Sequence, residues 1–279
     1  MREIFKRSLT GFFIVAVLIS SILLGKVALI CLVLLLTVFG LLEFYSLVER
    51  GGHHPLKLTG VFSGSLIALA SSLYLHGFID TIYLIGVIPL SFLILLVELF
   101  RRSENPIVNS GLTLLGMFYV VVPLALMNCL AYPPSSDAKN EIFQYSPNIL
   151  LGFFFLLWTN DSFAYLVGSR MGKKKLYESV SPNKSWEGIF GGAIFCLCCA
   201  YINNRIFEEL DLSKWLILGL LVIVFGTLGD LVQSLFKRSM QVKDTGAIFP
   251  GHGGILDRFD GVLFSIPFIV FYLQLLKLL

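Results

Sequence analysis

The sequence predicts an all-α polytopic membrane protein with about nine transmembrane helices, its N-terminus in the cytosol and its C-terminus outside. Three observations carry this prediction. Hydrophobic residues make up 56% of the 279 residues and charged residues 14%, whereas a soluble domain carries about 25% charged residues. The apolar residues form long continuous runs, which excludes disorder and disfavours a β-barrel, whose strands alternate apolar and polar residues. Finally, the basic residues gather in alternate loops.

Nine apolar runs approach the roughly 20 residues that a helix needs to cross a bilayer. These runs cover residues 8–24, 27–48, 58–76, 78–100, 106–132, 148–169, 186–206, 214–236 and 258–279. The first run follows Arg2, Lys6 and Arg7 and so resembles a signal peptide. No small-x-small cleavage pattern follows it, and we therefore expect an uncleaved first helix.

The basic residues orient these helices. With the N-terminus in the cytosol, sixteen of the 21 Lys and Arg residues fall in cytosolic segments and five on the opposite side. The positive-inside rule therefore predicts an N-in, C-out topology. The net charge is only +3, and we expect no nucleic-acid partner.

The five cysteines lie inside apolar runs, and their odd number argues against a disulfide framework. The cluster of Cys196, Cys198 and Cys199 is more typical of small buried apolar side chains than of a metal site.

Ionisable residues inside predicted spans are costly and by default mark function. Glu43 and Glu98 end the second and fourth spans near the cytosolic face. We expect them to be structural, with Glu43 pairing with Arg50, and Glu98 with Arg101 or Arg102. Asp161 lies at depth in the polar stretch 158–162, which indicates either a hydrogen-bond network between helices or a group facing a water-filled cavity.

A polar stripe marks the cytosolic third of the eighth span. Asp230, Gln233, Ser234 and Lys237 follow one another at i, i+3, i+4 and i+7, so they share one face of an otherwise apolar helix.

Two further carboxylates begin the ninth span. Asp257 and Asp260 lie three residues apart on one helical face, although a helix N-terminus favours aspartate in any case. We expect them to converge with Asp230 at one membrane depth, beside basic residues. Mg²⁺ binds through one or two carboxylates plus substrate phosphates, and cations bind phosphate oxygens. This combination is typical of phosphoryl or nucleotidyl transfer.

Two cytosolic segments add polar groups. The run Pro250–Gly254 holds three glycines whose amides can approach an anion, and its His252 is either a phosphate or base contact or a plain loop residue. The other segment begins with lysines 173–175, which are a topology signal or an anionic-lipid contact. It then places hydroxyls, Asn183 and Lys184 directly before a span.

The segment from Ser234 to Asp260 resembles the signature of phosphatidate cytidylyltransferases, or CDP-diacylglycerol synthases. The matching residues read Ser234-Leu-Phe-Lys237-Arg238, four residues, Lys243-Asp244, and then Pro250-Gly-His252-Gly-Gly-Ile-Leu-Asp257-Arg258-Phe-Asp260. The stretches 160–165 and 181–188 also resemble this family. Two departures are visible: Gln233 stands where the family usually has Glu, and Ser185 where it usually has Thr.

The resemblance implies transfer of the cytidylyl group of CTP to phosphatidate, with release of pyrophosphate. It implies Mg²⁺ dependence, with a second cation left open, and a multi-pass homodimer among the lipids of the inner bacterial membrane, its active site facing the cytosol. The expected metal ligands are Asp230, Asp257 and Asp260. The expected catalytic residues are Ser234, Lys237, Arg238, Lys243, Asp244 and His252. The expected substrate contacts are Asp161, Ser181, Asn183, Lys184 and Ser185.

Two other functions remain open. A CTP-dependent lipid kinase would use similar groups on a lipid alcohol. A transporter would explain polar residues in spans without catalysis, although here these residues gather at one face rather than at the midplane. Within one integrated membrane domain, we expect residues 1–147 to form the five N-terminal helices. Residues 148–279 then form the four catalytic helices with their cytosolic loops.

Overall fold

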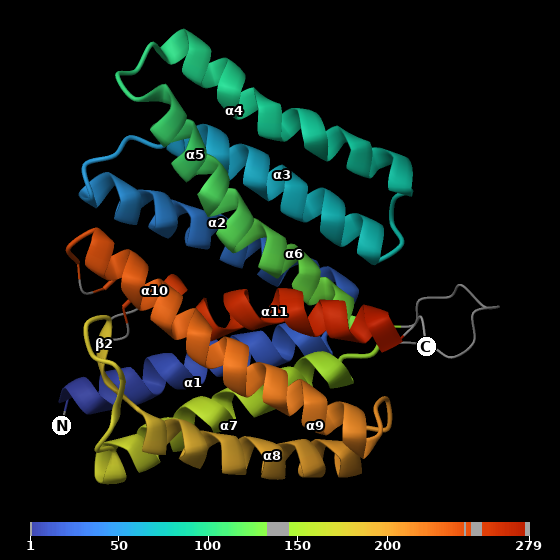
Figure 1. Cartoon of the computed structure of the whole chain (residues 1–279). Coiled ribbons are helices and arrows are strands. Elements are labelled where there is room, and N and C mark those ends of the chain that lie inside the picture. Colours follow the sequence, from blue (N-terminus) through green and yellow to red (C-terminus); the bar gives the residue numbers. More distant parts are fainter. Residues whose placement is uncertain (1, 133–144, 243, 247–252, 277–279) are drawn as a thin grey trace. The chain divides into compact units, whose positions relative to one another are not determined.

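The computed structural model describes residues 2–132, 145–242, 244–246 and 253–276, and it confirms an all-α membrane fold (Figure 1). The N-terminal helices are α1 (Arg2–Leu23), α2 (Lys26–Arg50), α3 (Lys57–Leu75), a 3-10 turn (Thr81–Gly86) with α4 (Val87–Arg101), and α5 (Pro106–Gly116) with α6 (Val122–Met127). The later ones are α7 (Asn148–Met171), α8 (Trp186–Ile206), α9 (Leu212–Leu221) with α10 (Thr227–Ser239), and α11 (Leu256–Leu276).

Eight helical segments in the described part of the chain are long and apolar enough to cross a membrane. They correspond to the second to ninth predicted runs. The first predicted run lies within α1, whose described apolar part, Leu9–Leu23, is shorter than the other eight. Continuous runs of Leu, Ile, Val and Phe form these helices because every backbone polar group must be satisfied within the segment in lipid.

Two of the spans contain a wider π-helical turn. One lies at Met117–Val121 between α5 and α6, and the other at Val222–Gly226 between α9 and α10. Single π turns within α-helices occur frequently at functional sites. The second turn directly precedes the helix that carries Asp230.

The chain divides into two compact units, and the functional division that we expect at residue 147 stays a prediction. The first unit holds residues 1–129 and 239–259, and the second holds 130–238 and 260–279. In the first unit α2 packs against α3, and α3 against α4 (Figure 1). In the second unit α8 packs against both α7 and α9. Helix α11 begins in the first unit and continues in the second.

Each unit has its own buried core. In the first, the fully buried Tyr45 donates a hydrogen bond of 2.9 Å to the carbonyl of Thr113. Its ring lies where a side chain at Gly60 or Gly116 would stand, so both glycines allow close helix approach. In the second, Phe153, Phe154 and Trp215 are fully buried.

A short antiparallel hairpin interrupts the helices. Strand β1 (Lys175–Tyr177) pairs with β2 (Ser181–Ser185), with Lys175 opposite Ser185 and Tyr177 opposite Ser181. The sequence did not predict this hairpin, because strands of three and five residues with Pro182 and Asn183 lack the periodicity of a strand.

The topology predicted from the basic residues is testable with reporters at both ends. A reporter fused after Leu279 should report a location outside the cytosol, and a reporter fused before Met1 should report a cytosolic location. A cytosolic signal from the C-terminal fusion would contradict the orientation of the later spans. An external signal from the N-terminal fusion alone would show that α1 does not cross.

Candidate active site

Three carboxylates gather in the second unit. They are Asp161 on α7, Asp230 on α10 and Asp260 near the start of α11. Asp260 is repelled electrostatically by Asp230 and by Asp161, and it is attracted by Lys184. The predicted proximity of Asp230 and Asp260 is therefore present in the structure, and Asp161 joins them.

Lys184 brings a cation from strand β2 to this group. Its Nζ lies 2.5 Å from Asp230 Oδ2, and it also donates a hydrogen bond of 3.2 Å to the carbonyl of Thr227. About a third of the Asp230 side chain and a quarter of the Lys184 side chain are exposed. We call Asp161, Asp230, Asp260 and Lys184 the carboxylate group.

The backbone at Gly229 sets the distance between α10 and α11. A Cβ atom at this position would lie 2.5 Å from the carbonyl oxygen of Asp260 and 2.7 Å from Cβ of Phe264. Glycine therefore lets the helix that carries Asp230 approach the helix that carries Asp260.

The hairpin is held at its base by the first turn of α8. Ser185 Oγ accepts a hydrogen bond of 3.2 Å from the Gly188 amide, so this buried serine is the N-cap of α8. The Glu187 carboxylate accepts hydrogen bonds from the amides of Lys173 and Lys174. These contacts fix the strand that presents Lys184. Ser185 has a structural role here, and its predicted substrate contact stays a prediction.

Glu43 does not pair with Arg50 as expected. Its buried carboxylate accepts hydrogen bonds from the amides of Ile255, at 2.7 Å, and Leu256, at 3.3 Å, and from the hydroxyl of Thr245. Because these partners are about 200 residues away in sequence, the local pattern of charges around Glu43 gave no sign of them.

Asp257 belongs to the same network in the first unit. Its Oδ2 accepts hydrogen bonds from the amide of Thr245 at 3.0 Å, from the Thr245 hydroxyl at 2.9 Å and from the amide of Gly254 at 3.2 Å. We call Glu43, Thr245, Gly254 and Asp257 the loop network. Asp257 thus supports the signature loop, by which we mean residues 244–246 and 253–255 of the described chain. Its predicted metal-ligand role stays a prediction.

Within the described residues, no three His, Cys, Asp or Glu side chains are placed to hold a metal ion. A divalent cation that used Asp230 as a ligand would have to compete with the Lys184 ammonium, which lies 2.5 Å from Asp230 Oδ2.

The remaining predicted residues have varied surroundings. Ser234 is buried, and its hydroxyl lies 3.5 Å from Asp230 Oδ1. Gln233, the departure from the family pattern, is fully buried one residue earlier. Half-buried positions are Ser181 and Lys237, and exposed ones are Asn183, Arg238 and Asp244. Lys243 and His252 lie outside the described residues.

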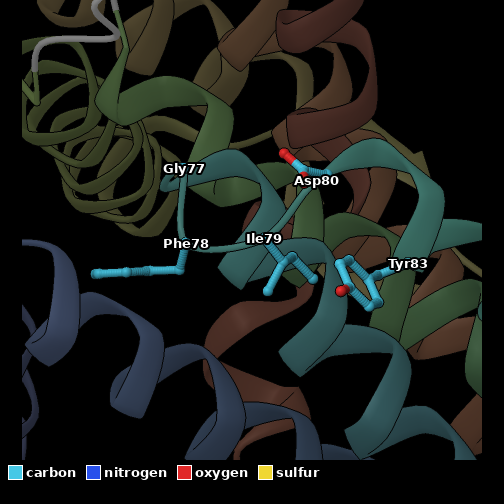
Figure 2. A pocket seen from close by; sticks show the side chains of 5 residues that line it. All are labelled: Gly77, Phe78, Ile79, Asp80 and Tyr83. Carbon is cyan, nitrogen blue, oxygen red and sulfur yellow. The ribbon is translucent and has the colours of Figure 1, made fainter.

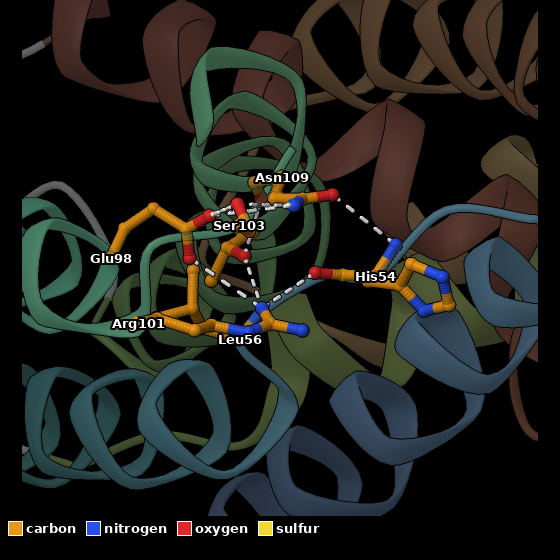
Figure 3. Close-up of polar contacts among 7 residues, drawn as sticks. His54, Leu56, Glu98, Arg101, Ser103 and Asn109 are labelled. Atoms are coloured by element: carbon orange, nitrogen blue, oxygen red, sulfur yellow. Dashed lines mark hydrogen bonds and ion pairs between the residues drawn. The ribbon is translucent and has the colours of Figure 1, made fainter. Parts of the chain in front are cut away.

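Glu98 fulfils its structural prediction. Arg101 Nη1 lies 3.5 Å from Glu98 Oε2 and donates a hydrogen bond of 2.8 Å to the carbonyl of His54 (Figure 3). The hydroxyl of Ser103 and the amide of Asn109 also donate to Glu98. This buried carboxylate therefore joins the end of α4 to α5 and to the segment before α3.

A pocket of about 250 Å³ opens in the first unit beyond the end of α3 (Figure 2). Its lining holds the carboxylate of Asp80 and no basic side chain; the lining residues are Gly77, Phe78, Ile79, Asp80 and Tyr83. The neighbouring His76 carbonyl accepts a hydrogen bond from Lys26, at the start of α2. The pocket is remote from the loop network, because Glu43 lies about 25 Å from Lys26 along α2 at a rise of 1.5 Å per residue. A pocket without cations does not suit a nucleotide.

Glu43 and Thr245 are the functional candidates that sequence reasoning missed. The sequence marks Glu43 as a carboxylate in a span but does not indicate its partners. The start of the last helix has backbone amides without a partner in the helix, and this need for an acceptor was the available signal. Thr245 directly follows Lys243 and Asp244 of the signature, where its hydroxyl is one more hydrogen-bonding group.

Comparison with known proteins identifies relatives along nearly the whole chain. A sequence model of the cytidylyltransferase family matches residues 5–276. A phosphatidate cytidylyltransferase of Staphylococcus epidermidis is 32% identical over 264 residues, which cover 94% of this chain and 95% of the relative. The proteins of the same name from Staphylococcus haemolyticus and Staphylococcus aureus are 33% and 31% identical, with the same coverage.

The close approach at Gly229 predicts a selective loss of stability. Gly229→Ala should lower the free energy of unfolding by about 1–3 kcal/mol, because the new methyl group overlaps the Asp260 backbone. The matched control is Gly219→Ala in the preceding α9, where the nearest atom to the new Cβ is 3.5 Å away. The control should be neutral or stabilising, since Ala is favoured over Gly in helices by about 1 kcal/mol. Unfolding in one detergent measures both; equal losses would contradict the packing argument.

Proposed function

This chain belongs to the cytidylyltransferase family, and we propose that it transfers the cytidylyl group of CTP to phosphatidate, forming CDP-diacylglycerol and pyrophosphate. The structural observation that carries the proposal is the carboxylate group. Three carboxylates lie together on apolar membrane helices, and Lys184 joins them from strand β2. Charge of this kind in a span is expensive and indicates a functional site.

The membrane location suits the two substrates. Phosphatidate presents its phosphate at the membrane surface, whereas CTP is a water-soluble anion that cannot enter hydrocarbon. We propose that the reaction takes place at the cytosolic face, since the basic residues that the positive-inside rule assigns to that face lie next to the signature. A homodimer in the bacterial membrane remains our expectation.

The chemistry requires little proton transfer. The second pKa of a phosphate monoester is about 6, so the phosphate oxygen of phosphatidate is already mostly anionic at neutral pH. This oxygen attacks the α-phosphorus of CTP, a new phosphorus–oxygen bond forms, and the bond to the β-phosphate breaks to release pyrophosphate. The protein's task is to hold two anions in line and to balance their charge.

We propose that Mg²⁺ binds at the carboxylate group together with substrate phosphates, since no three described side chains are placed to hold the ion by themselves. Carboxylate oxygens are the ligands that this cation prefers, and Asp161, Asp230 and Asp260 bring three carboxylates close together. We propose Asp230 and Asp260 as ligands, with Asp161 nearby, and Asp257 stays a further candidate. Bound Mg²⁺ would neutralise phosphate charge and act as a Lewis acid.

We propose that cationic side chains neutralise the remaining negative charge of the phosphates. Lys184 already lies against Asp230 at 2.5 Å, and a competing cation would free its ammonium for a phosphate oxygen. Lys237 and Arg238 follow Asp230 on the same helix. We expect Lys243 and His252 to contribute from the signature loop.

Removal of single charges from the carboxylate group should abolish most turnover. Asp230→Asn and Asp260→Asn should each lower kcat by about 10²–10³, the range typical of one lost electrostatic contact in an active site. The matched control is Asp211→Asn, which makes the same charge change at the N-cap of α9, where Asn and Asp cap about equally well. Turnover of labelled CTP with phosphatidate, titrated with Mg²⁺ and with chelator, measures this. Near-normal rates in both variants would exclude Asp230 and Asp260 from catalysis.

The fate of the phosphates distinguishes this transferase from a CTP-dependent lipid kinase. A lipid alcohol must lose a proton as it attacks, so a kinase benefits from a base in hydrogen-bond reach. A phosphatidate oxygen needs none. With CTP labelled separately at the α- and γ-phosphorus, the α label should enter the lipid and the γ label should leave as pyrophosphate. Entry of the γ label into lipid, with CDP accumulating, would establish the kinase instead. If neither the α label nor the γ label enters lipid, a non-enzymatic role such as transport is left.

A further inference from the structure

The carboxylate of Glu43 reaches from α2 to the loop network at the start of α11. It accepts hydrogen bonds from the amides of Ile255 and Leu256 and from the Thr245 hydroxyl. The side chain is only 4% exposed. The contact therefore joins the N-terminal half of the chain to the signature segment inside one compact unit.

This contact solves a general problem of helix ends. The first amides of a helix have no partner within it, and a buried amide without a partner is costly. Helix α11 begins at Leu256, so two of the amides at its start are satisfied by Glu43. The negative charge is also favoured there by the helix dipole. Glu43 thus acts as an N-cap supplied from another helix.

The glycines of the signature loop make room for this carboxylate. A Cβ atom at Gly254 would overlap Oε1 of Glu43, and one at Gly246 would lie 3.0 Å from its Cδ. Gly253 has a φ of +80°, and a Cβ atom there would lie 2.8 Å from Asp257 Oδ2. These glycines therefore serve contacts inside the protein.

Thr245 links Glu43 to Asp257. Its hydroxyl lies within hydrogen-bond reach of both carboxylates, at 2.9 Å from Asp257 Oδ2 and closer to Glu43 Oε1. A hydroxyl has one proton and donates to one acceptor at a time. The two carboxylates therefore share a donor, so a displacement of Glu43 changes the surroundings of Asp257 directly.

We propose that Glu43 is a positioning residue for the signature loop and for the first turn of α11. It acts through Thr245 and the Ile255 and Leu256 amides, which orient Asp257; Asp260 follows one turn later on the same helix. The catalytic part of this inference depends on the proposed function. Its structural part, the immobilisation of residues 253–257 by a side chain of α2, does not.

The first experiment compares two buried carboxylates of the same unit. Glu43→Gln keeps the size of the side chain but loses one acceptor oxygen, and Glu98→Gln makes the same change in a network away from the loop. Amide hydrogen exchange should be at least about tenfold faster in the peptide 253–257 for Glu43→Gln, because local opening becomes easier. Glu98→Gln should leave that peptide unchanged and loosen residues 101–113 instead.

Kinetics on the same proteins separate positioning from general stability. We expect Glu43→Gln to lower kcat by at least about tenfold, with KM for CTP within about threefold, because alignment is lost while binding groups remain. Glu98→Gln should keep kcat even where its unfolding midpoint falls by the same amount. If both variants lose kcat in proportion to stability, Glu43 has no positioning role.

A double variant tests the contact itself. Gly254→Ala should reduce kcat as much as Glu43→Ala, because either change breaks the fit between loop and carboxylate. In the combined variant the smaller residue at 43 leaves room for the new methyl group, so the loss should not exceed that of either change alone. Additive losses would overturn the proposal. So would wild-type exchange at 253–257 together with wild-type kcat in Glu43→Gln. If wild-type protein shows no CTP turnover, the proposed function fails, and the exchange comparison still decides the structural part.

Discussion

Compensation of charge in apolar surroundings is the constraint on which the polar part of this molecule depends. An ionised carboxylate in a membrane helix must find a cation or hydrogen-bond donors, and this chain uses both solutions. Glu43 is held by fixed backbone amides and a hydroxyl. Asp230 pairs with a lysine on a flexible stem and accepts a long hydrogen bond of 3.5 Å from the Ser234 hydroxyl. Fixed amides cannot leave, and an ammonium can. The two arrangements differ in rigidity: Glu43 is held by fixed backbone groups, whereas the ion pair of Asp230 can exchange its partner.

Glycine is what allows these polar contacts to form between helices. Lipid supplies no hydrophobic force between membrane helices, so they associate through close packing and hydrogen bonds. At Gly229 the absence of a side chain lets α10 reach the Asp260 backbone, and at Gly254 it leaves space for Glu43. Gly188 does the same between α8 and α7, where a Cβ atom would lie 2.8 Å from the Ala164 carbonyl. A glycine in a signature motif is thus as compatible with a contact inside the protein as with a bound phosphate.

The helices and the meeting of Asp230 with Asp260 follow from the sequence, because each depends on one local property. A run of about 20 apolar residues forms a membrane-spanning helix. Two carboxylates near the predicted cytosolic ends of successive spans therefore lie at similar depth. The hairpin that carries Lys184 was missed because its strands are too short for a periodic pattern. The partner of Glu43 was missed for another reason: Arg50 is near in sequence, whereas Ile255 is brought close by tertiary packing alone. Pairing rules based on neighbouring charges fail when backbone amides compete as donors.

In this chain the loop network gives the N-terminal helices a role beyond anchoring in the membrane. The residues that resemble the family signature most closely lie between 158 and 260, yet the family match runs from residue 5 to 276. If the early helices served only as an anchor, any apolar spans would do. The start of α11 needs an acceptor for its amides, and in this chain the acceptor comes from α2. A second half detached from α2 would begin its last helix with two buried amides unsatisfied, at a cost of about 1–3 kcal/mol each. The signature is therefore complete only together with a carboxylate that lies about 200 residues before it.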